Sequence, residues 1–181
     1  MAIKPRVYLD SCCFIDAVKH DAGILPKERE NDVWFIKKIF EAHRAGILIA
    51  HTSLVAVGEC LAIEKGQVDV PEIAKDRFKS LLTSGQYVQL LSPTPETARW
   101  IQRFRWDHNL VLGAVDAIHF ACAIERGCTE FITMDGRIKS TKVAAAIPSL
   151  NSLGLRVIVA PKTAFLPSSF TQGKLDDTQG P

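Results

Sequence analysis

The sequence predicts an α/β protein with three layers, α/β/α, built on a mostly parallel five-stranded sheet. Five short runs rich in β-branched and aromatic residues recur along the chain, separated by segments whose apolar residues have helical spacing. Strands that alternate with helices form parallel sheets with helices on both faces. The 181 residues, 47% hydrophobic and 23% charged, suit one globular domain with a sizeable core.

The first part of the chain has the pattern strand, helix, helix, strand. A β-rich run at the very start favours a central strand, and a glycine beyond an apolar stripe favours the end of a helix. The expected elements are a strand at 6–9, a brief helix at 14–18, a loop at 19–31, a helix capped by Asn31 or Asp32 with the stripe Val33, Ile36, Ile39 and Phe40 and ended by Gly46, and a strand at 47–50.

The rest of the chain continues this alternation. Pro71 and Pro95 stand where proline fits the first turn of a helix. The expected elements are a helix capped by Thr52 or Ser53 and running to about residue 64, a helix from Pro71 to Gly85 with Ile73, Phe78, Leu81 and Leu82 facing inward, helices at 94–106 and 115–125, strands at 87–91, 131–133 and 156–159, and a helix at 141–147 that ends before Pro148.

Composition separates one domain from a tail and limits the class of protein. We expect residues 1–160 to form the domain and residues 161–181 an extended or disordered tail, since the tail has three prolines among Ser, Thr, Gln and Asp residues. The net charge of +2 excludes no partner, and five cysteines without zinc-site spacing indicate free thiols in a reducing compartment. No signal-peptide pattern or run of ~18 apolar residues is evident, so we expect a cytoplasmic protein that does not enter a membrane.

Four acidic residues are placed to meet at one edge of the predicted sheet. Each follows a predicted strand or lies on a helix that does, and sites in open α/β sheets form beyond the carboxyl ends of the strands. The four are Asp10, Glu59, Asp116 and Asp135. Taken alone, Asp116 could simply suit the first turn of a helix, and Asp135 could simply belong to a turn. The prediction therefore rests on all four acids reaching the same edge.

Such a cluster has a chemical consequence. Carboxylates gathered without counter-charges repel one another, which raises their pKa values unless a cation lies among them. Oxygen ligands suit Mg²⁺ or Mn²⁺, which can activate water and stabilise the charge that develops during attack on phosphorus. The acids therefore suggest metal-assisted hydrolysis of phosphodiester bonds.

The same residues carry a family resemblance. Residues 5–160 resemble the PIN domain, the nuclease fold of VapC-type toxins in toxin–antitoxin pairs. The matching motifs are Leu9-Asp10-Ser11, Gly58-Glu59-Cys60, Asp116-Ala117-Ile118-His119-Phe120-Ala121 and Thr133-Met134-Asp135. One departure is Cys12, where a small polar residue is usual, and we expect this change to loosen the surroundings of a bound metal.

The resemblance implies an activity and a set of partners. Residues 1–160 would be a PIN-like nuclease domain that cleaves RNA with Mg²⁺ or Mn²⁺, and the protein would be the toxin of a type II toxin–antitoxin pair. Its partners would be an RNA substrate, a cognate antitoxin and a second copy of the chain. The four acids would bind the metal or orient water, and Ser11 and Thr133 would support them through hydrogen bonds.

Some assignments keep two interpretations at this stage. Arg137 and Lys139 follow the last acid and could hold a substrate phosphate, or could belong to a charged surface helix. His119 could contact RNA, or could be packed and hydrogen-bonded, and we expect Asp16 to be solvated. For the whole chain, the alternative function is a non-catalytic PIN-like module that binds RNA or protein. A phosphatase with an aspartyl nucleophile is disfavoured, because Cys12 occupies the place of its second aspartate.

Overall fold

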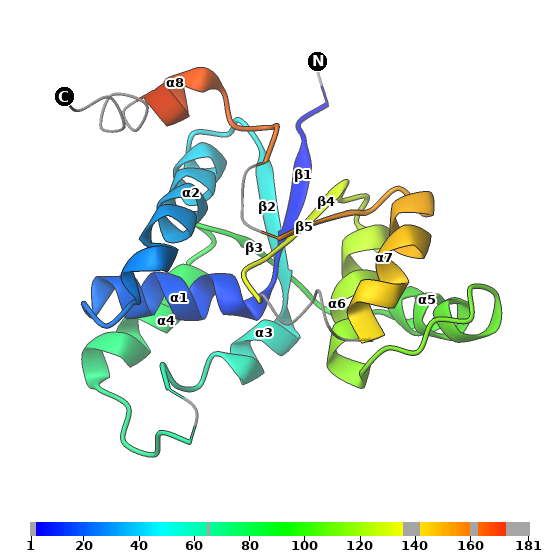
Figure 1. Ribbon diagram of the computed structural model, residues 1–181, viewed down its shortest axis with the longest axis horizontal. Coiled ribbons are helices and arrows are strands. Elements are labelled where there is room, and N and C mark those ends of the chain that lie inside the picture. Colours follow the sequence, from blue (N-terminus) through cyan, green and yellow to red (C-terminus); the bar gives the residue numbers. More distant parts are fainter. Residues whose placement is uncertain (1–2, 65, 136–141, 160–162, 173–181) are drawn as a thin grey trace.

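The computed structural model describes residues 3–64, 66–135, 142–159 and 163–172. Its centre is a five-stranded sheet in the order β3-β2-β1-β4-β5, in which every neighbouring pair is parallel (Figure 1). The strands are β1 Arg6–Leu9, β2 Ile49–Ser53, β3 Gln89–Leu91, β4 Glu130–Thr133 and β5 Arg156–Val159. The predicted α/β class and the central place of the first strand are confirmed.

Helices cover both faces of the sheet, so the protein has the expected three layers. In Figure 1, α1, α2 and α4 lie on one side of the sheet and α5, α6 and α7 on the other. The helices are α1 Ser11–Asp21, α2 Lys27–Arg44, α3 Leu54–Glu59, α4 Glu72–Thr83, α5 Pro95–Trp106, α6 Ala114–Glu125, α7 Lys142–Ser152 and α8 Ser168–Thr171.

The central strand β1 divides the core into two clusters. Val7 and Leu9 belong to the cluster formed with α1, α2 and α4, whereas Tyr8 belongs to the cluster formed with α5, α6 and α7. This alternation follows from the period of two in a β-strand. All three side chains are fully buried, as expected for a strand with helices on both faces. The carboxyl end of β1 therefore emerges between two packed layers.

The register of the sheet places the ends of β1 and β4 side by side. Leu9 pairs with Ile132, and the amide of Asp10 donates to the Ile132 carbonyl at 3.0 Å. Because every pair of neighbouring strands is parallel, residues that follow the strands leave the sheet at one edge.

The first helices are longer than the sequence pattern predicted. α1 continues to Asp21 and α2 begins at Lys27, so the loop expected at 19–31 is wrong at both ends. The start of α2 has Pro26 at its N-cap and acidic residues in its first turn, which suit the helix dipole. Neither Asn31 nor Asp32 is therefore a cap. The predicted apolar stripe of this helix is buried.

The second strand and the helix after it are displaced from their predicted positions. β2 begins at Ile49 rather than at residue 47 and ends in His51, Thr52 and Ser53, which are polar but buried. Ser53 caps α3 as expected, since its Oγ accepts from the Val55 amide at 3.2 Å. α3 ends at Glu59 instead of near residue 64.

Two later predictions also need correction. α7 continues through Pro148 to Ser152, although a proline removes one helical hydrogen bond. Burial of Ala146 and Leu150 in the core beside α6 favours continuation of this helix. In α4, Phe78, Leu81 and Leu82 face inward as expected, but Ile73 is 78% exposed.

The part of the tail that the structure describes, residues 163–172, is folded against the domain. It contains the short helix α8, which lies beside α2 (Figure 1). Phe165, Leu166 and Phe170 pack against the core cluster of α1, α2 and α4. This segment is therefore not simply extended. No helix in the described ranges is long and apolar enough to cross a membrane.

Candidate active site

The four predicted acids leave the sheet at its carboxyl edge on four different elements. Asp10 directly follows β1 and is the N-cap of α1, and Asp135 comes two residues after β4. Asp116 lies in the first turn of α6. Glu59 is the last residue of α3, which follows β2 directly and packs against α6. The topology thus brings together residues that are far apart in the sequence.

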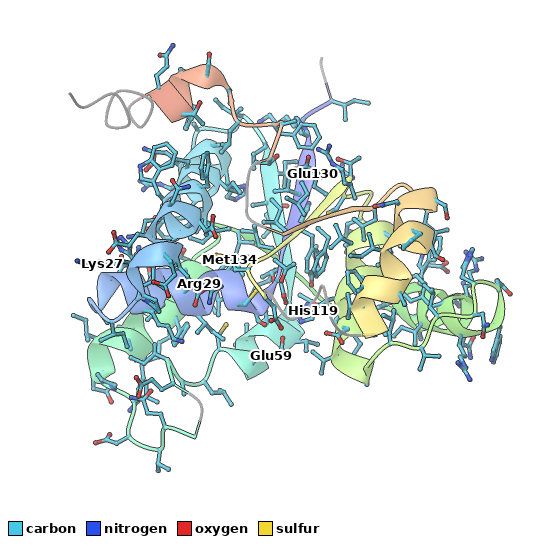
Figure 2. The ribbon with its side chains drawn as sticks, viewed as in Figure 1. Lys27, Arg29, Glu59, His119, Glu130 and Met134 are labelled. Carbon is cyan, nitrogen blue, oxygen red and sulfur yellow. The ribbon has the colours of Figure 1, made fainter. Side chains whose placement is uncertain are left out.

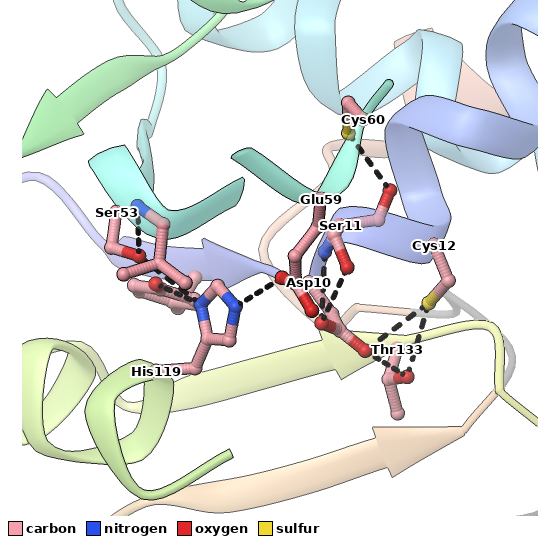
Figure 3. A network of polar contacts seen from close by, with 10 residues as sticks. Asp10, Ser11, Cys12, Ser53, Glu59, Cys60, His119 and Thr133 are labelled. Atoms are coloured by element: carbon pink, nitrogen blue, oxygen red, sulfur yellow. Dashed lines mark hydrogen bonds and ion pairs between the residues drawn. The ribbon is translucent and has the colours of Figure 1, made fainter. Parts of the chain in front are cut away.

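Asp10 is held by several hydrogen bonds (Figure 3). Its Oδ1 accepts from the backbone amide of Ser11, the first residue of α1, at 2.8 Å. Its Oδ2 accepts from the Thr133 hydroxyl at 2.8 Å and from the Cys12 thiol at 3.2 Å. Donors to both oxygens fix the orientation of the carboxylate.

The thiol of Cys12 takes the place of a small polar side chain in this network. Besides Asp10, it lies 3.3 Å from the Thr133 hydroxyl and accepts from the Met134 amide at 3.1 Å. Thr133 in turn accepts from the Asp135 amide at 3.1 Å. Cys12 and Thr133 therefore connect Asp10 to the backbone of the segment that carries Asp135.

Glu59 is held from the interior of the protein by His119. The imidazole Nε2 lies 2.7 Å from Oε2 of Glu59, and Figure 2 shows the two side chains together below the sheet. Partial burial raises the pKa of Glu59, but the hydrogen bond from His119 and the electrostatic attraction of its ring, with a contribution from Ser11, outweigh this effect and lower it. Glu59 is thus stabilised as an anion.

Asp116 has a different environment. Its pKa is raised by partial burial and by the negative charge of Asp10, and then by Glu59 and Asp135, against a lowering effect of His119. No hydrogen bond from a described residue reaches its carboxylate. The other three acids therefore act together on Asp116, as expected for carboxylates that share one site.

The donor set fits a hard divalent cation. All four acids offer oxygen ligands of the kind that Mg²⁺ and Mn²⁺ prefer, and their mutual repulsion would be relieved by positive charge. Within the described ranges, no three His, Cys, Asp or Glu side chains already form a ligand group around one point. The carboxylates would therefore have to move closer together to bind one ion.

The segment after β4 is also fixed by an ion pair that the sequence did not predict. Arg29 of α2 donates through Nη2 to the Met134 carbonyl at 2.5 Å and pairs with Asp16 at 2.6 Å (Figure 2). Asp16 is only 3% exposed, so the expectation that it is solvated is wrong. Burial raises the pKa of Asp16, and the charge of Arg29 offsets only part of this effect. Arg29 also holds the residue before Asp135.

The other predicted residues have different positions relative to the acids. Thr133 donates to Asp10 through its hydroxyl at 2.8 Å, whereas Ser11 does so through its amide at 2.8 Å and more distantly through its hydroxyl at 3.4 Å. His119 is 2% exposed and lies on the interior side of Glu59. Its side chain is therefore packed and hydrogen-bonded, the second of the two interpretations. Arg137 and Lys139 lie outside the described residues. Tyr8, Ser53 and Arg29 were missed, because no local pattern relates them to acids elsewhere in the chain.

Comparison with known proteins agrees with this architecture. The sequence profile of the PIN domain matches residues 7–144. No curated protein matches the chain. A chain from the crystal structure of VapBC2 from Rickettsia felis bound to a DNA fragment from their promoter has a similar fold, with a TM-score of 0.54. The two are 13% identical, and the similarity covers 85% of this chain and 98% of the other. PIN domains are generally nucleases. The matched profile, the parallel sheet and the acids at its carboxyl edge show that this chain belongs to the PIN domain family.

Proposed function

We propose that this protein is a metal-dependent endoribonuclease that hydrolyses phosphodiester bonds of RNA with Mg²⁺ or Mn²⁺. The observation that carries this proposal is the position of four acidic residues at one edge of the sheet. The negative charges of Asp10, Glu59 and Asp135 all raise the pKa of Asp116. Each of the four acids lies in or beside a different helix or strand. Such an arrangement destabilises the site unless it serves to bind a cation.

The residues divide the work of the reaction. A bound Mg²⁺ or Mn²⁺ would supply positive charge to the phosphate and lower the pKa of water. Asp10, Asp116 and Asp135 would hold the ion, and Glu59 would accept a hydrogen bond from the attacking water. Ser11 and Thr133 would keep the Asp10 oxygens in place through the bonds that they already make. Arg137 and Lys139 remain predicted contacts for the substrate phosphate.

We further propose that the protein is the toxin of a type II toxin–antitoxin pair and acts in the cytoplasm. The PIN domain and the fold shared with a chain of the VapBC2 complex support this role. A cognate antitoxin would then bind this chain, and a homodimer would place two acidic sites near one RNA. Induced expression should arrest growth, and the Asp116→Asn variant should not. Growth arrest by both proteins would contradict a toxin role for the acidic site.

The nuclease proposal is tested with a circular single-stranded RNA, because only an endonuclease can open it. Wild-type protein should linearise the circle with Mg²⁺ or Mn²⁺, and EDTA should abolish cleavage. Water attack predicts product ends without a 2′,3′-cyclic phosphate, since the water oxygen enters at phosphorus. The variants Asp10→Asn and Asp116→Asn should be inactive. The matched control is Asp76→Asn, which removes an exposed carboxylate of α4.

Two outcomes would contradict the proposal. Equal cleavage by the wild type, Asp10→Asn and Asp116→Asn would show that these acids do not form the active site. If wild type binds the RNA but leaves it intact at millimolar Mn²⁺, the protein is a non-catalytic binding module.

A further inference from the structure

A buried chain of polar side chains connects the central strand to Glu59. Tyr8 of β1 places its hydroxyl 2.7 Å from Nδ1 of His119, and Nε2 of His119 lies 2.7 Å from Glu59 (Figure 3). The Ser53 hydroxyl is a second, longer contact of Nδ1 at 3.3 Å. Tyr8 is 0% and His119 2% exposed, so water does not compete for these contacts.

The chemistry of the groups sets the direction of these hydrogen bonds. A carboxylate only accepts, so Nε2 of His119 must donate to Glu59. In a neutral imidazole Nδ1 is then an acceptor, and the Tyr8 hydroxyl is its donor. Burial raises the pKa of Tyr8, which keeps this hydroxyl protonated. Tyr8 and Glu59 therefore favour the same tautomer of His119, the one with its proton on Nε2.

Packing fixes the members of the chain in place. The Tyr8 ring stacks on Phe131, with centroids 5.2 Å apart and planes at 10°. It also meets the His119 ring edge-on at 5.8 Å and 71°. Aromatic packing of this kind restricts both rings, so the hydroxyl and the imidazole stay aligned.

A second buried histidine shows that this pairing is not a general result of burial. His51 of β2 pairs in register with Tyr8 and is 6% exposed. Its Nδ1 has no hydrogen-bond partner in the part of the chain that the structure describes. Burial, followed by the charge of Arg6, lowers the pKa of His51 to about 4. His119, by contrast, has a partner at each nitrogen.

We propose that Tyr8 and His119 are positioning residues for Glu59. Tyr8 stabilises the His119 tautomer with its proton on Nε2, and His119 orients the carboxylate of Glu59. The hydroxyl of Tyr8, a buried residue that does not touch substrate, would thus influence the orientation of Glu59 through His119. The effect on cleavage rests on the proposed nuclease function, whereas the tautomer does not.

The first test is the protonation of the imidazole, measured by long-range ¹H–¹⁵N NMR at neutral pH. Wild-type His119 should carry its proton on Nε2 and none on Nδ1, and the His119→Gln variant assigns its signals among the five histidines. Tyr8→Phe removes only the hydroxyl, so Glu59 alone favours the Nε2 proton and the share of the tautomer protonated on Nδ1 should rise. Tyr87→Phe is the matched control and should leave the His119 signals unchanged.

The second test measures Mn²⁺ binding by calorimetry and RNA cleavage. Tyr8→Phe should weaken Mn²⁺ binding or lower kcat by about 10- to 100-fold, the usual effect of losing a partner that orients a ligand, with little change in KM. His119→Gln keeps a donor near the Nε2 position and should retain more activity than His119→Ala. Tyr87→Phe should match wild type.

Three results would overturn the inference. These are a proton on Nδ1 in the wild type, a Tyr8→Phe variant with the wild-type tautomer, and a Tyr8→Phe variant with wild-type Mn²⁺ affinity and kcat. The wild-type spectrum is decisive even if a variant fails to fold. If the wild type cleaves no RNA while Tyr8→Phe still changes the tautomer and weakens Mn²⁺ binding, the nuclease proposal fails but the positioning role stands.

Discussion

Two halves of the acidic site differ in how their carboxylates are treated. Asp10 and Glu59 receive hydrogen bonds from neighbouring side chains, and the pKa of Glu59 is lowered mainly by its contact with His119 despite partial burial. Asp116 receives none from the described residues, and its pKa is raised by partial burial and by the other three acids. We refer to Asp10 and Glu59 as the held half and to Asp116 as the open half.

This difference suggests how the proposed cation site is organised. In the held half, hydrogen-bond donors orient the carboxylate oxygens before any ion binds. In the open half, no hydrogen bond from the described residues offsets the repulsion that the other acids exert on Asp116. A bound cation would therefore relieve the most repulsion there. Hydrogen bonds therefore orient Asp10 and Glu59, whereas charge repulsion acts on Asp116.

The largest expected effect comes from the same substitution in each half. Asp10→Asn and Asp116→Asn should both lose cleavage by more than the ~100-fold typical of losing an outer partner. Their stabilities without metal should differ in direction. Asp10→Asn loses charge-assisted hydrogen bonds and should unfold about 1–3 kcal/mol more easily. Asp116→Asn relieves repulsion and should gain less than about 1 kcal/mol, because solvent screens this partly exposed group. Urea denaturation with EDTA measures both changes.

The pH dependence checks the assignment to Asp116. Its folded pKa lies above the ordinary value of 3.8, so the native state holds this proton more tightly than the unfolded chain does. The contribution of Asp116 to stability is full below pH 3.8 and is lost as the pH rises through the raised pKa. The advantage of Asp116→Asn should grow across that window and then stay constant. Equal stability of the two Asn variants at every pH would remove the distinction between the halves.

The next effect concerns the hydroxyl that orders the held half. Thr133→Val keeps the shape of the side chain but removes the donor to Asp10 and the acceptor of the Asp135 amide. Mn²⁺ affinity or kcat should fall by about 10- to 100-fold, while the fold is kept. Thr133→Ser retains the hydroxyl and serves as the control. Wild-type activity in the valine variant would show that Asp10 needs no help from this side.

A smaller effect on the site, with a clear effect on stability, is expected at Arg29. Arg29→Met leaves the buried Asp16 without its partner and the Met134 carbonyl without this donor. The free energy of unfolding should fall on the order of 1–3 kcal/mol, since Arg29 is partly exposed. Arg29→Lys restores the charge but not the planar fork and should be intermediate. Equal stability of all three proteins would contradict the role of this ion pair.

The smallest effect is expected at Gly113, the N-cap of α6. A Cβ added there would lie 3.1 Å from Oδ2 of Asp116, so the carboxylate would have to move slightly. Its φ of −63° suits any residue, so Gly113→Ala should leave stability within about 0.5 kcal/mol. Mn²⁺ affinity should fall by much less than the ~100-fold cost of a 1 Å misplacement. Gly58→Ala, where a Cβ meets nothing within 4 Å, is the control.

Periodicity and topology were enough to predict the main features of the fold. The alternation of strands and helices gave the parallel sheet, and the rule that sites lie at the carboxyl edge gave the location of the four acids. Helix boundaries were less predictable where signals conflicted. The first residues of α2 are polar, so the sequence pattern gave no sign of where this helix starts. Pro148 suggested that α7 ends before it, but packing favours continuation of the helix.

The contacts that hold the acids could not be predicted in the same way. Tyr8 and His119 are 111 residues apart, and Arg29 and Met134 are 105 apart. Only the folded layers bring these pairs together, because the chain between them crosses the sheet several times. Buried polar residues in strands, such as His51 and Ser53, also give no periodic signal.

The short helix α8 has a practical consequence for anyone who trims or tags this protein. A truncation after Val159 would keep all four acids and every strand, yet it would strip Phe165, Leu166 and Phe170 from the surface of α2. The uncovered apolar patch would favour aggregation in the expression host. The minimal well-behaved version should therefore extend through Gln172, and affinity tags are better attached there, since α8 lies at the opposite end of the sheet from the acids (Figure 1).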